Sequence, residues 1–234
     1  MVLPHAEPVA ERGNGVSVAD RLASLRAEIA TEAQACGRDP AAIALVGVAK
    51  RQPLATVREA IAAGLTDVAE NYAQEARAAF AHLPAVRRHF VGHVQRNKAA
   101  AIEELFDVVQ SVDRLEAGVA LAQAAERAGR VLAVLVQLNV SEGERFGCPP
   151  QEGERLADAL RSSPSLRVDG VMAIGPLTAE RDEIARAFER AAMTFARIGG
   201  STLSMGMSGD WREAVRAGST MLRIGTALFG SRSR

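Results

Sequence analysis

The chain has 234 residues, of which 48% are hydrophobic and 24% are charged, and this length and mix are typical of one globular α/β barrel. Its 28 basic and 28 acidic side chains give a formal net charge of zero, which excludes the electrostatic footprint of a nucleic-acid or acidic-membrane binder. No apolar run approaches the roughly 18 residues of a membrane span, and the N-terminal stretch contains no apolar core of a secretory signal.

Residues 1–15 are rich in proline, glycine and charge, and we expect them to form a flexible arm. Residues 16–36 carry apolar side chains every three or four positions, which predicts a helix that Gly37 ends. Short apolar runs then alternate with helical patterns. The expected strands are Ala44–Ala49, Asp67–Ala69, His89–Val91, Val108–Ser111, Leu132–Asn139, Gly170–Ala173, Thr202–Ser204 and Met221–Ile224. The expected helices that follow them are 53–63, 71–82, 95–104, 113–128, 149–161, 179–197, 208–217 and 226–231.

This alternation predicts parallel strands that helices cover on the outside. An open doubly wound sheet has the same pattern, but eight regular units in about 190 residues favour a single (β/α)8 TIM-type barrel. The expected barrel comprises residues 16–234, including the extra N-terminal helix. Functional groups of such barrels lie where strands end and helices begin. We therefore expect one rim to collect Lys50, Glu70, Asn71 and the segments after the last two strands.

Lysine is rare in this chain. Of the 28 basic residues only Lys50 and Lys98 are lysines, so the other 26 are arginines. The simplest interpretation of this bias is a GC-rich genome that encodes arginine for any surface cation. Under such a bias, a lysine that remains is a candidate for a role that arginine cannot fill. Lysine can lose its proton and act as a nucleophile, whereas arginine keeps its charge.

Lys50 follows the apolar run Leu45–Ala49 at the end of the first expected strand. Removal from water disfavours the charged form of an amine. A neutral amine at this position could attack an aldehyde and form a Schiff base. The alternative is a solvated lysine in a surface loop, and this pattern alone leaves both interpretations open.

Two segments near the C-terminus predict an anion site. Gly225 and Thr226 lie where the last expected strand gives way to a helix, so that free backbone N–H groups face an approaching anion. Ser208 follows the seventh strand, and TIM barrels often bind phosphate after strands seven and eight. The alternatives are a plain turn for Gly225 and a helix N-cap for Ser208.

Arg223 lies near the end of the last expected strand, where its side chain could face a cofactor ring. An arginine opposite a pyridine nitrogen keeps this nitrogen unprotonated, whereas a carboxylate would protonate it and make the ring a strong electron sink. Arg223 therefore argues against transamination or decarboxylation. The alternative is an ordinary ion pair.

Five stretches of the chain form an ordered set of motifs. They are Val46–Lys50, Ala69–Glu75, His89–Lys98, Val171–Pro176, and Ser204–Asp210 running on to Gly218–Gly230. Each is weak alone, but together they resemble the pyridoxal phosphate (PLP) homeostasis protein family, the single-domain barrel relatives of bacterial alanine racemase. The resemblance implies a role for six residues. They are Lys50 as the Schiff-base lysine, Asn71 as lining of the cofactor pocket, Arg223 facing the pyridine nitrogen, and Ser208, Gly225 and Thr226 as phosphate contacts.

The resemblance implies a PLP carrier or buffer inside the cell, with no assigned catalytic turnover. The implied partners are the small-molecule cofactor and, as recipients, PLP-dependent apo-enzymes, and we expect a monomer that binds neither nucleic acid nor membrane. Cys36 and Cys148 do not make a disulfide framework, which fits the reducing cytoplasm.

The chain departs from the family pattern at two places. Val68-Ala69 replaces the usual Phe-Gly before Glu70, and the loop 139–147 carries Arg145 where a lysine is usual. The second departure puts in doubt a role of this loop in accepting or releasing PLP.

Two other functions remain open. A minimal PLP-dependent racemase-like enzyme would need a second acid or base, for which His93 is a candidate, whereas Tyr72 is expected to pack. A barrel for a phosphorylated sugar or nucleotide would use Lys50 as a counter-ion. Lys98 could contact PLP or a partner, and the alternative is a structural or solvated role. His89 and His93 have no acidic or cysteine cluster beside them, so we expect no metal site.

Overall fold

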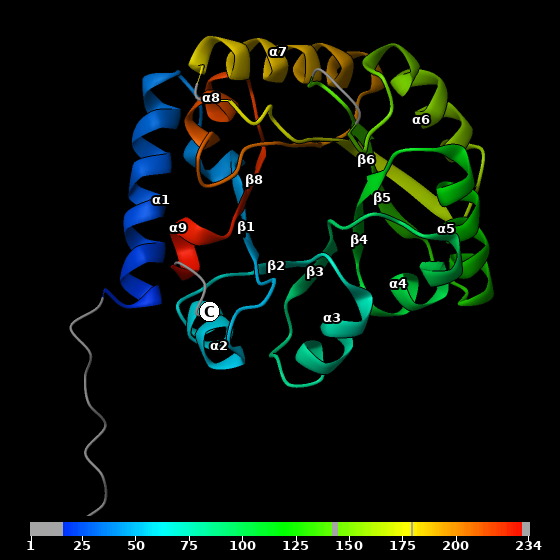
Figure 1. Cartoon of the computed structure of the whole chain (residues 1–234), viewed down its shortest axis with the longest axis horizontal. Coiled ribbons are helices and arrows are strands. Elements are labelled where there is room, and N and C mark those ends of the chain that lie inside the picture. Colours follow the sequence, from blue (N-terminus) through cyan, green and yellow to red (C-terminus); the bar gives the residue numbers. More distant parts are fainter. Residues whose placement is uncertain (1–15, 142–144, 179, 231–234) are drawn as a thin grey trace, which may run out of the picture.

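The computed structural model describes residues 16–141, 145–178 and 180–230, and the predicted arm, residues 1–15, lies outside this part. Eight parallel strands close into a barrel in sequence order, with β8 pairing back onto β1. The helices form a ring around the strands (Figure 1). The predicted (β/α)8 barrel with an extra N-terminal helix is therefore confirmed.

The barrel strands are β1 (Ala44–Val48), β2 (Asp67–Glu70), β3 (Arg87–Phe90), β4 (Val108–Val112), β5 (Leu132–Leu138), β6 (Leu166–Ala173), β7 (Thr202–Ser204) and β8 (Met221–Ile224). The α-helices are α1 (Val18–Ala35), α2 (Leu54–Ala62), α3 (Ala73–Phe80), α4 (Ala99–Leu105), α5 (Leu115–Arg127), α6 (Gly153–Arg161), α7 (Arg181–Ile198), α8 (Trp211–Arg216) and α9 (Thr226–Phe229). Short 3-10 turns are η1 (Pro40–Ala42), η2 (Arg96–Lys98) and η3 (Pro150–Glu152).

The longer strands are mostly apolar because they are covered on both faces. Every residue of β4 and of β5 is buried, as expected for parallel strands between a helix ring and a barrel interior. Leu22, Leu25 and Ile29 of α1 are buried at helical spacing, so this helix packs one apolar stripe onto the barrel.

The extra helix α1 lies beside α8 and α9, at the left of Figure 1, and also contacts α2. Ser17 caps it, because its side chain accepts a hydrogen bond from the backbone N–H of Asp20. Gly37 follows the helix with a φ of 67°, as the sequence predicts for a C-terminal cap. From α1, the Nε of Arg21 donates to the carbonyl of Leu228 at 2.7 Å and so holds the short helix α9.

The largest difference from the sequence-based prediction concerns β6. This strand begins at Leu166 and not at Gly170. Gly170 lies inside the strand, where it adopts a φ of 144° at a register shift. A Cβ at Gly170 would lie 2.0 Å from the carbonyl oxygen of Thr202, so only glycine fits this bulge.

The helix predicted from residue 208 begins at Trp211 instead. Residues 208–210 form a turn in which Asp210 Oδ1 accepts from the backbone N–H of Met207, and Ser208 does not cap α8.

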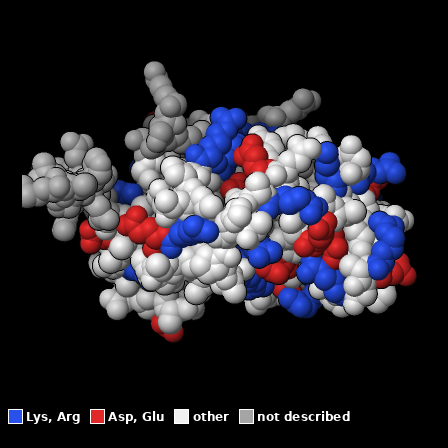
Figure 2. Space-filling view, turned by 90° about the horizontal axis from the view of Figure 1, so that it is seen from below, with Lys and Arg blue, Asp and Glu red and all other residues white. Residues whose placement is uncertain are grey.

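On the face shown in Figure 2, basic and acidic side chains are interspersed, in line with the neutral net charge. No helix in the described ranges is long and apolar enough to cross a membrane.

Candidate functional site

Lys50 is the second residue after β1 and lies in a tight turn that the N–H of Gln52 closes by donating to the carbonyl of Ala49 at 2.8 Å. Within the described residues, Arg51 is the one non-glycine residue with a left-handed φ, 57°. This conformation costs an L-residue about 1–2 kcal/mol, and such strain clusters at functional sites. The Nζ of the partly buried Lys50 lies 5.0 Å from the ring centroid of Tyr72.

Tyr72 does not pack into the core, contrary to the sequence-based expectation. Its side chain is 46% exposed and lies at the rim, at the start of α3. The aromatic face is therefore open to the Lys50 amine on one side, an arrangement that stabilises a cation or covers an amine.

Glu70 ends β2 and is buried, with only 4% of its surface exposed. Its Oε2 has no hydrogen-bond partner among the described residues. Burial raises the pKa of Glu70 to about 7, and repulsion by Glu75 adds to the rise, while Lys50 and the backbone N–H of Asn71 oppose it. A carboxyl group that titrates near neutral pH therefore lies within electrostatic reach of the Lys50 amine.

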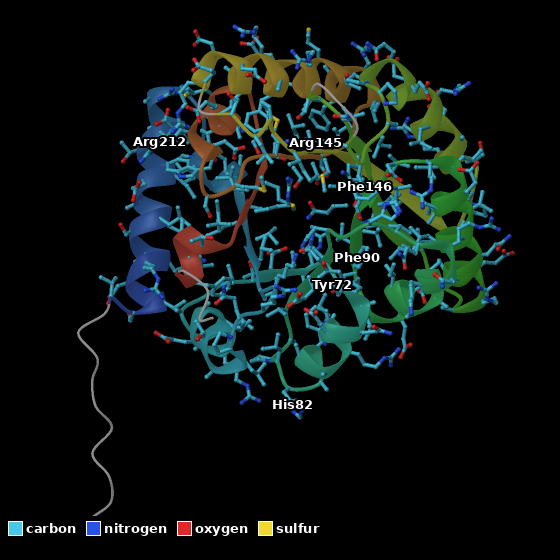
Figure 3. All side chains as sticks on the ribbon, viewed as in Figure 1. Tyr72, His82, Phe90, Arg145, Phe146 and Arg212 are labelled. Atoms are coloured by element: carbon cyan, nitrogen blue, oxygen red, sulfur yellow. The ribbon has the colours of Figure 1, made fainter. Side chains whose placement is uncertain are left out.

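A cavity of about 770 Å³ opens at the barrel mouth. Its wall is formed by the segments that follow β2, β3, β5 and β6, and Figure 3 shows Tyr72, Arg145 and Phe146 near the centre of this mouth. The described residues that line it are Asn71, Tyr72, Val91, Gly92, His93, Gln137, Asn139, Arg145, Phe146 and Ile174.

Gly92 sets the position of Asn71 in this wall. A Cβ at Gly92 would lie 1.9 Å from the carbonyl oxygen of Asn71, so the backbones after β2 and β3 touch at a distance that only glycine permits. Ser111 donates to the carbonyl of Gly92. This close approach holds the Asn71 segment at the rim.

His93, Arg145 and Phe146 form the far side of the cavity. The rings of His93 and Phe146 stack with centroids 4.2 Å apart, and Arg145 donates to the carbonyl of Gly175 at 3.2 Å. Lys98 lines a separate, smaller hollow of about 200 Å³ that also reaches Asn71.

The segments after β7 and β8 meet through Ser208. Its hydroxyl accepts a hydrogen bond from the backbone N–H of Ala227 at 3.1 Å, which joins the two loops. Gly225 precedes α9 with open space around it, since a Cβ there would meet nothing nearer than the Val48 carbonyl oxygen at 3.7 Å. Ser208 lines a hollow of about 380 Å³ with α1 and α8, distinct from the cavity that Asn71 lines.

Arg223 lies in β8 and is buried. Its Nη1 donates to the carbonyl and to the hydroxyl of Ser204 at 2.8 and 2.7 Å, and its Nη2 donates to the carbonyl of Ala173 at 2.8 Å. Burial lowers the pKa of Arg223 to about 10, and the charge of Asp210 opposes this shift. Arg223 makes no ion pair with the described residues, so the ion-pair alternative is wrong, and its Nε has no hydrogen-bond partner among them.

The sequence-predicted residues thus fall into connected groups. Ser208 is joined to the Thr226 segment, and β1 pairs with β8, so that the strand leading to Lys50 runs beside the strand of Arg223. Asn71 lies across the mouth in the larger cavity. Sequence reasoning placed Glu70 on the rim without a specific role, and it did not single out Gln137, although a polar residue inside the otherwise apolar β5 was a signal. The described residues contain no cluster of three or more groups that could hold a metal ion.

The comparisons with known proteins first define the class. The alanine racemase N-terminal domain family matches residues 21–233 of this chain. The chain belongs to the PLP homeostasis protein family, with 45% identity over 222 residues to such a protein from Pseudomonas aeruginosa, covering 92% of this chain and 96% of the relative. The Escherichia coli K12 member is 38% identical over 229 residues, 92% of this chain and 97% of that protein.

A solved structure is similar over the same length. It is PipY of Synechococcus elongatus with PLP bound, 34% identical, with a TM-score of 0.81 over 92% of this chain and 100% of that chain. The predicted family is confirmed by these matches.

Proposed function

We propose that this protein binds PLP and acts in its intracellular homeostasis, with Lys50 holding the cofactor as a Schiff base. The observation that carries the proposal is that Lys50 follows a strand that pairs with β8. In this pairing Val46 lies opposite Arg223, and Gly225 follows one residue after Ile224, the partner of Gly47. An amine, a buried cation and an open glycine therefore belong to adjoining strand ends. The relative with PLP bound supports the same ligand.

The donor set fits PLP. When bound, PLP supplies an aldehyde carbon and an electron-accepting ring. The Lys50 amine would hold the aldehyde carbon, and the Arg223 Nε, which has no partner within the described residues, would face the ring nitrogen. Ser208, Gly225 and Thr226 would hold the phosphate with hydroxyl and backbone N–H groups. Asn71 would line the pocket.

We further infer that the protein stores or transfers PLP without catalytic turnover. A guanidinium keeps its protons and cannot protonate the ring nitrogen, so the ring stays a weak electron sink. The relatives carry the name of homeostasis proteins, which supports this role. Residues 16–234 would act as a cytoplasmic monomer that gives PLP to apo-enzymes.

The two lysines provide a direct test. The purified protein, mixed with PLP, should gain absorbance near the visible range, and borohydride reduction should fix the cofactor to the peptide that contains Lys50. Lys50→Ala should abolish both signals because no amine remains at the end of β1. Lys98→Ala is the matched control, since it removes the one other lysine of the chain, and it should retain them.

Two outcomes would contradict the proposal. A wild-type protein that takes up no PLP would favour the phosphorylated-ligand barrel. Sustained interconversion of D- and L-alanine by the loaded protein would contradict the storage role and support the racemase-like enzyme.

A further inference from the structure

The barrel interior contains a continuous chain of hydrogen-bonded side chains, which we call the polar chain. Its members come from five of the eight strands. They are Arg223 (β8), Ser204 (β7), Gln110 (β4), His89 (β3) and Asp67 (β2).

Each link of the polar chain has a good hydrogen-bond distance. Arg223 Nη1 to Ser204 Oγ measures 2.7 Å, and Ser204 Oγ to Gln110 Oε1 measures 2.7 Å. Gln110 Nε2 to His89 Nδ1 and His89 Nε2 to Asp67 Oδ1 each measure 2.8 Å. Because β4 and β7 are not neighbours in the sheet, the link between Gln110 and Ser204 crosses the barrel interior.

The chemistry of the two ends sets the direction of every bond. Arg223 can only donate, so the Ser204 hydroxyl accepts from it and turns its own hydrogen toward Gln110 Oε1. The Gln110 amide N–H then donates to His89 Nδ1, which leaves the ring proton on Nε2 for Asp67. All four donors thus point the same way, from the cation to the carboxylate, an arrangement in which hydrogen bonds polarise one another.

Asp67 supplies a fixed anion at the other end of the barrel. It begins β2, whereas Arg223 lies near the end of β8. Burial acts to raise the pKa of Asp67, but hydrogen bonds from His89 and Thr66 and the charge of Arg87 outweigh it, so the pKa is lowered. The carboxylate therefore stays ionised at neutral pH and terminates the polar chain as an acceptor.

Arg223 needs such a device because a buried cation without a hydrogen-bonded carboxylate is costly, and the charge of Asp210 offsets only part of this cost. Its direct contacts are two carbonyls and one hydroxyl. We propose that the polar chain is a positioning device: its line of hydrogen bonds, which ends on the Asp67 carboxylate, holds Arg223 in one orientation. For the cofactor this rests on the proposed function, because the orientation of Arg223 matters there only if PLP binds beside it.

The sharpest variant is Asp67→Asn, which keeps an acceptor for His89 but removes the charge at the far end of the polar chain. Asp169→Asn is the matched control, because Asp169 has a similar side-chain exposure of 16%, against 14% for Asp67, and pairs with the exposed Arg167 outside the chain. Gln110→Leu breaks the middle link. Circular dichroism and urea unfolding would show that each variant is folded.

The first readout uses the protein without PLP. In ¹⁵N nuclear magnetic resonance we expect slowly exchanging Nη–H signals of Arg223, because these protons are hydrogen-bonded to Ser204 and Ala173, and a His89 proton on Nε2. Gln110→Leu should speed exchange of the Arg223 signal on the order of tenfold, the effect of one lost buried hydrogen bond. Asp67→Asn, which keeps the bond to His89 and removes only the charge, should speed it about threefold. The Asp169→Asn signal should match wild type.

The second readout is the dissociation constant for PLP, with the absorption maximum of the loaded protein. We expect the constant to rise about tenfold in Gln110→Leu and about threefold in Asp67→Asn, with no change in Asp169→Asn. If Asp67→Asn matches its control in both readouts, the polar chain does not position Arg223 and the inference is overturned. A wild type that binds no PLP but whose Arg223 signal depends on Asp67 would overturn the proposed function and retain the positioning role.

Discussion

At the scale of single residues, the barrel mouth depends on groups whose burial changes their chemistry. Glu70 is buried with an unpaired oxygen, and Arg223 is buried without an ion pair among the described residues. The sequence pattern could predict Lys50 and Arg223 because a strand end and a charged residue in an apolar run are local signals. It placed Glu70 on the same rim as Lys50 but could not predict the raised pKa of its carboxyl group, because this comes mainly from burial in the folded barrel.

Glu70 makes stability depend on pH. Between pH 4.5 and about 7 the folded protein keeps a proton that the unfolded chain releases, so the free energy of unfolding should fall as pH rises through this window. At pH 8 the buried carboxylate should cost about 3 kcal/mol. Glu70→Gln should remove this slope and stabilise the protein at pH 8 by up to about that amount, which urea unfolding of the PLP-free protein at pH 5 to 8 would measure.

Glu126→Gln serves as the control for this experiment, because Glu126 is exposed on α5. It should leave the pH profile unchanged. Parallel profiles for wild type and Glu70→Gln would show that the Glu70 carboxyl is not shifted.

At the scale of elements, the rim is built by turns that the sequence pattern located only in part. The alternation placed the ends of β1 and β8 within one residue of their observed positions. It did not reveal the left-handed turn at Arg51, because no glycine marks the position. It also missed the first half of β6, since Gly170 interrupts the apolar pattern where the strand bulges.

The turn after Lys50 should respond to the residue at position 51. Arg51→Gly should stabilise the protein by about 0.5–1 kcal/mol, because glycine adopts a φ of 57° without the steric cost but loses more backbone entropy on folding. Arg51→Val should destabilise it by about 1–2 kcal/mol, since a β-branched residue is poorly tolerated there. Urea midpoints would give both values.

Gln52→Val tests whether any substitution in this turn has the same effect. Its φ is not in the left-handed region, so we expect a change below about 0.5 kcal/mol. Equal losses for the two valine variants would mean that backbone strain at Arg51 is not the cause.

At the scale of the whole molecule, the closed barrel follows from the regular alternation of eight units. The extent of pairing between two neighbouring strands, which we call a seam, does not follow from it. β5 and β6 pair along seven residues of β5, Leu132–Leu138, whereas β7 and β8 share one register pair, Ser204 with Met221. The short seam lies between the two loops proposed to hold phosphate. Hydrophobic periodicity does not predict the number of paired residues in a seam, because this number depends on where the chain leaves each strand and enters a loop.

Hydrogen exchange should show the short seam opening first. In the PLP-free protein, the amides of Met205 and Arg223, which bond across β7 and β8, should exchange before those of β5. PLP should reduce this difference, since a ligand that bridges both loops stabilises the closed seam. Mass spectrometry of peptides with and without PLP would measure the effect. Equal exchange of both regions in the two states would contradict a ligand across this seam.

The scarcity of lysine has a consequence for the proposed cargo. Aldehydes condense with any exposed side-chain amine, and in most proteins a reactive aldehyde scatters over many such groups. Here the cations of the described surface ion pairs are arginines, which do not form imines, and the whole chain offers an aldehyde two lysine amines. With so few competing amines, nearly all of the bound aldehyde would occupy one site and be released from it, and little would remain as imines on the protein surface.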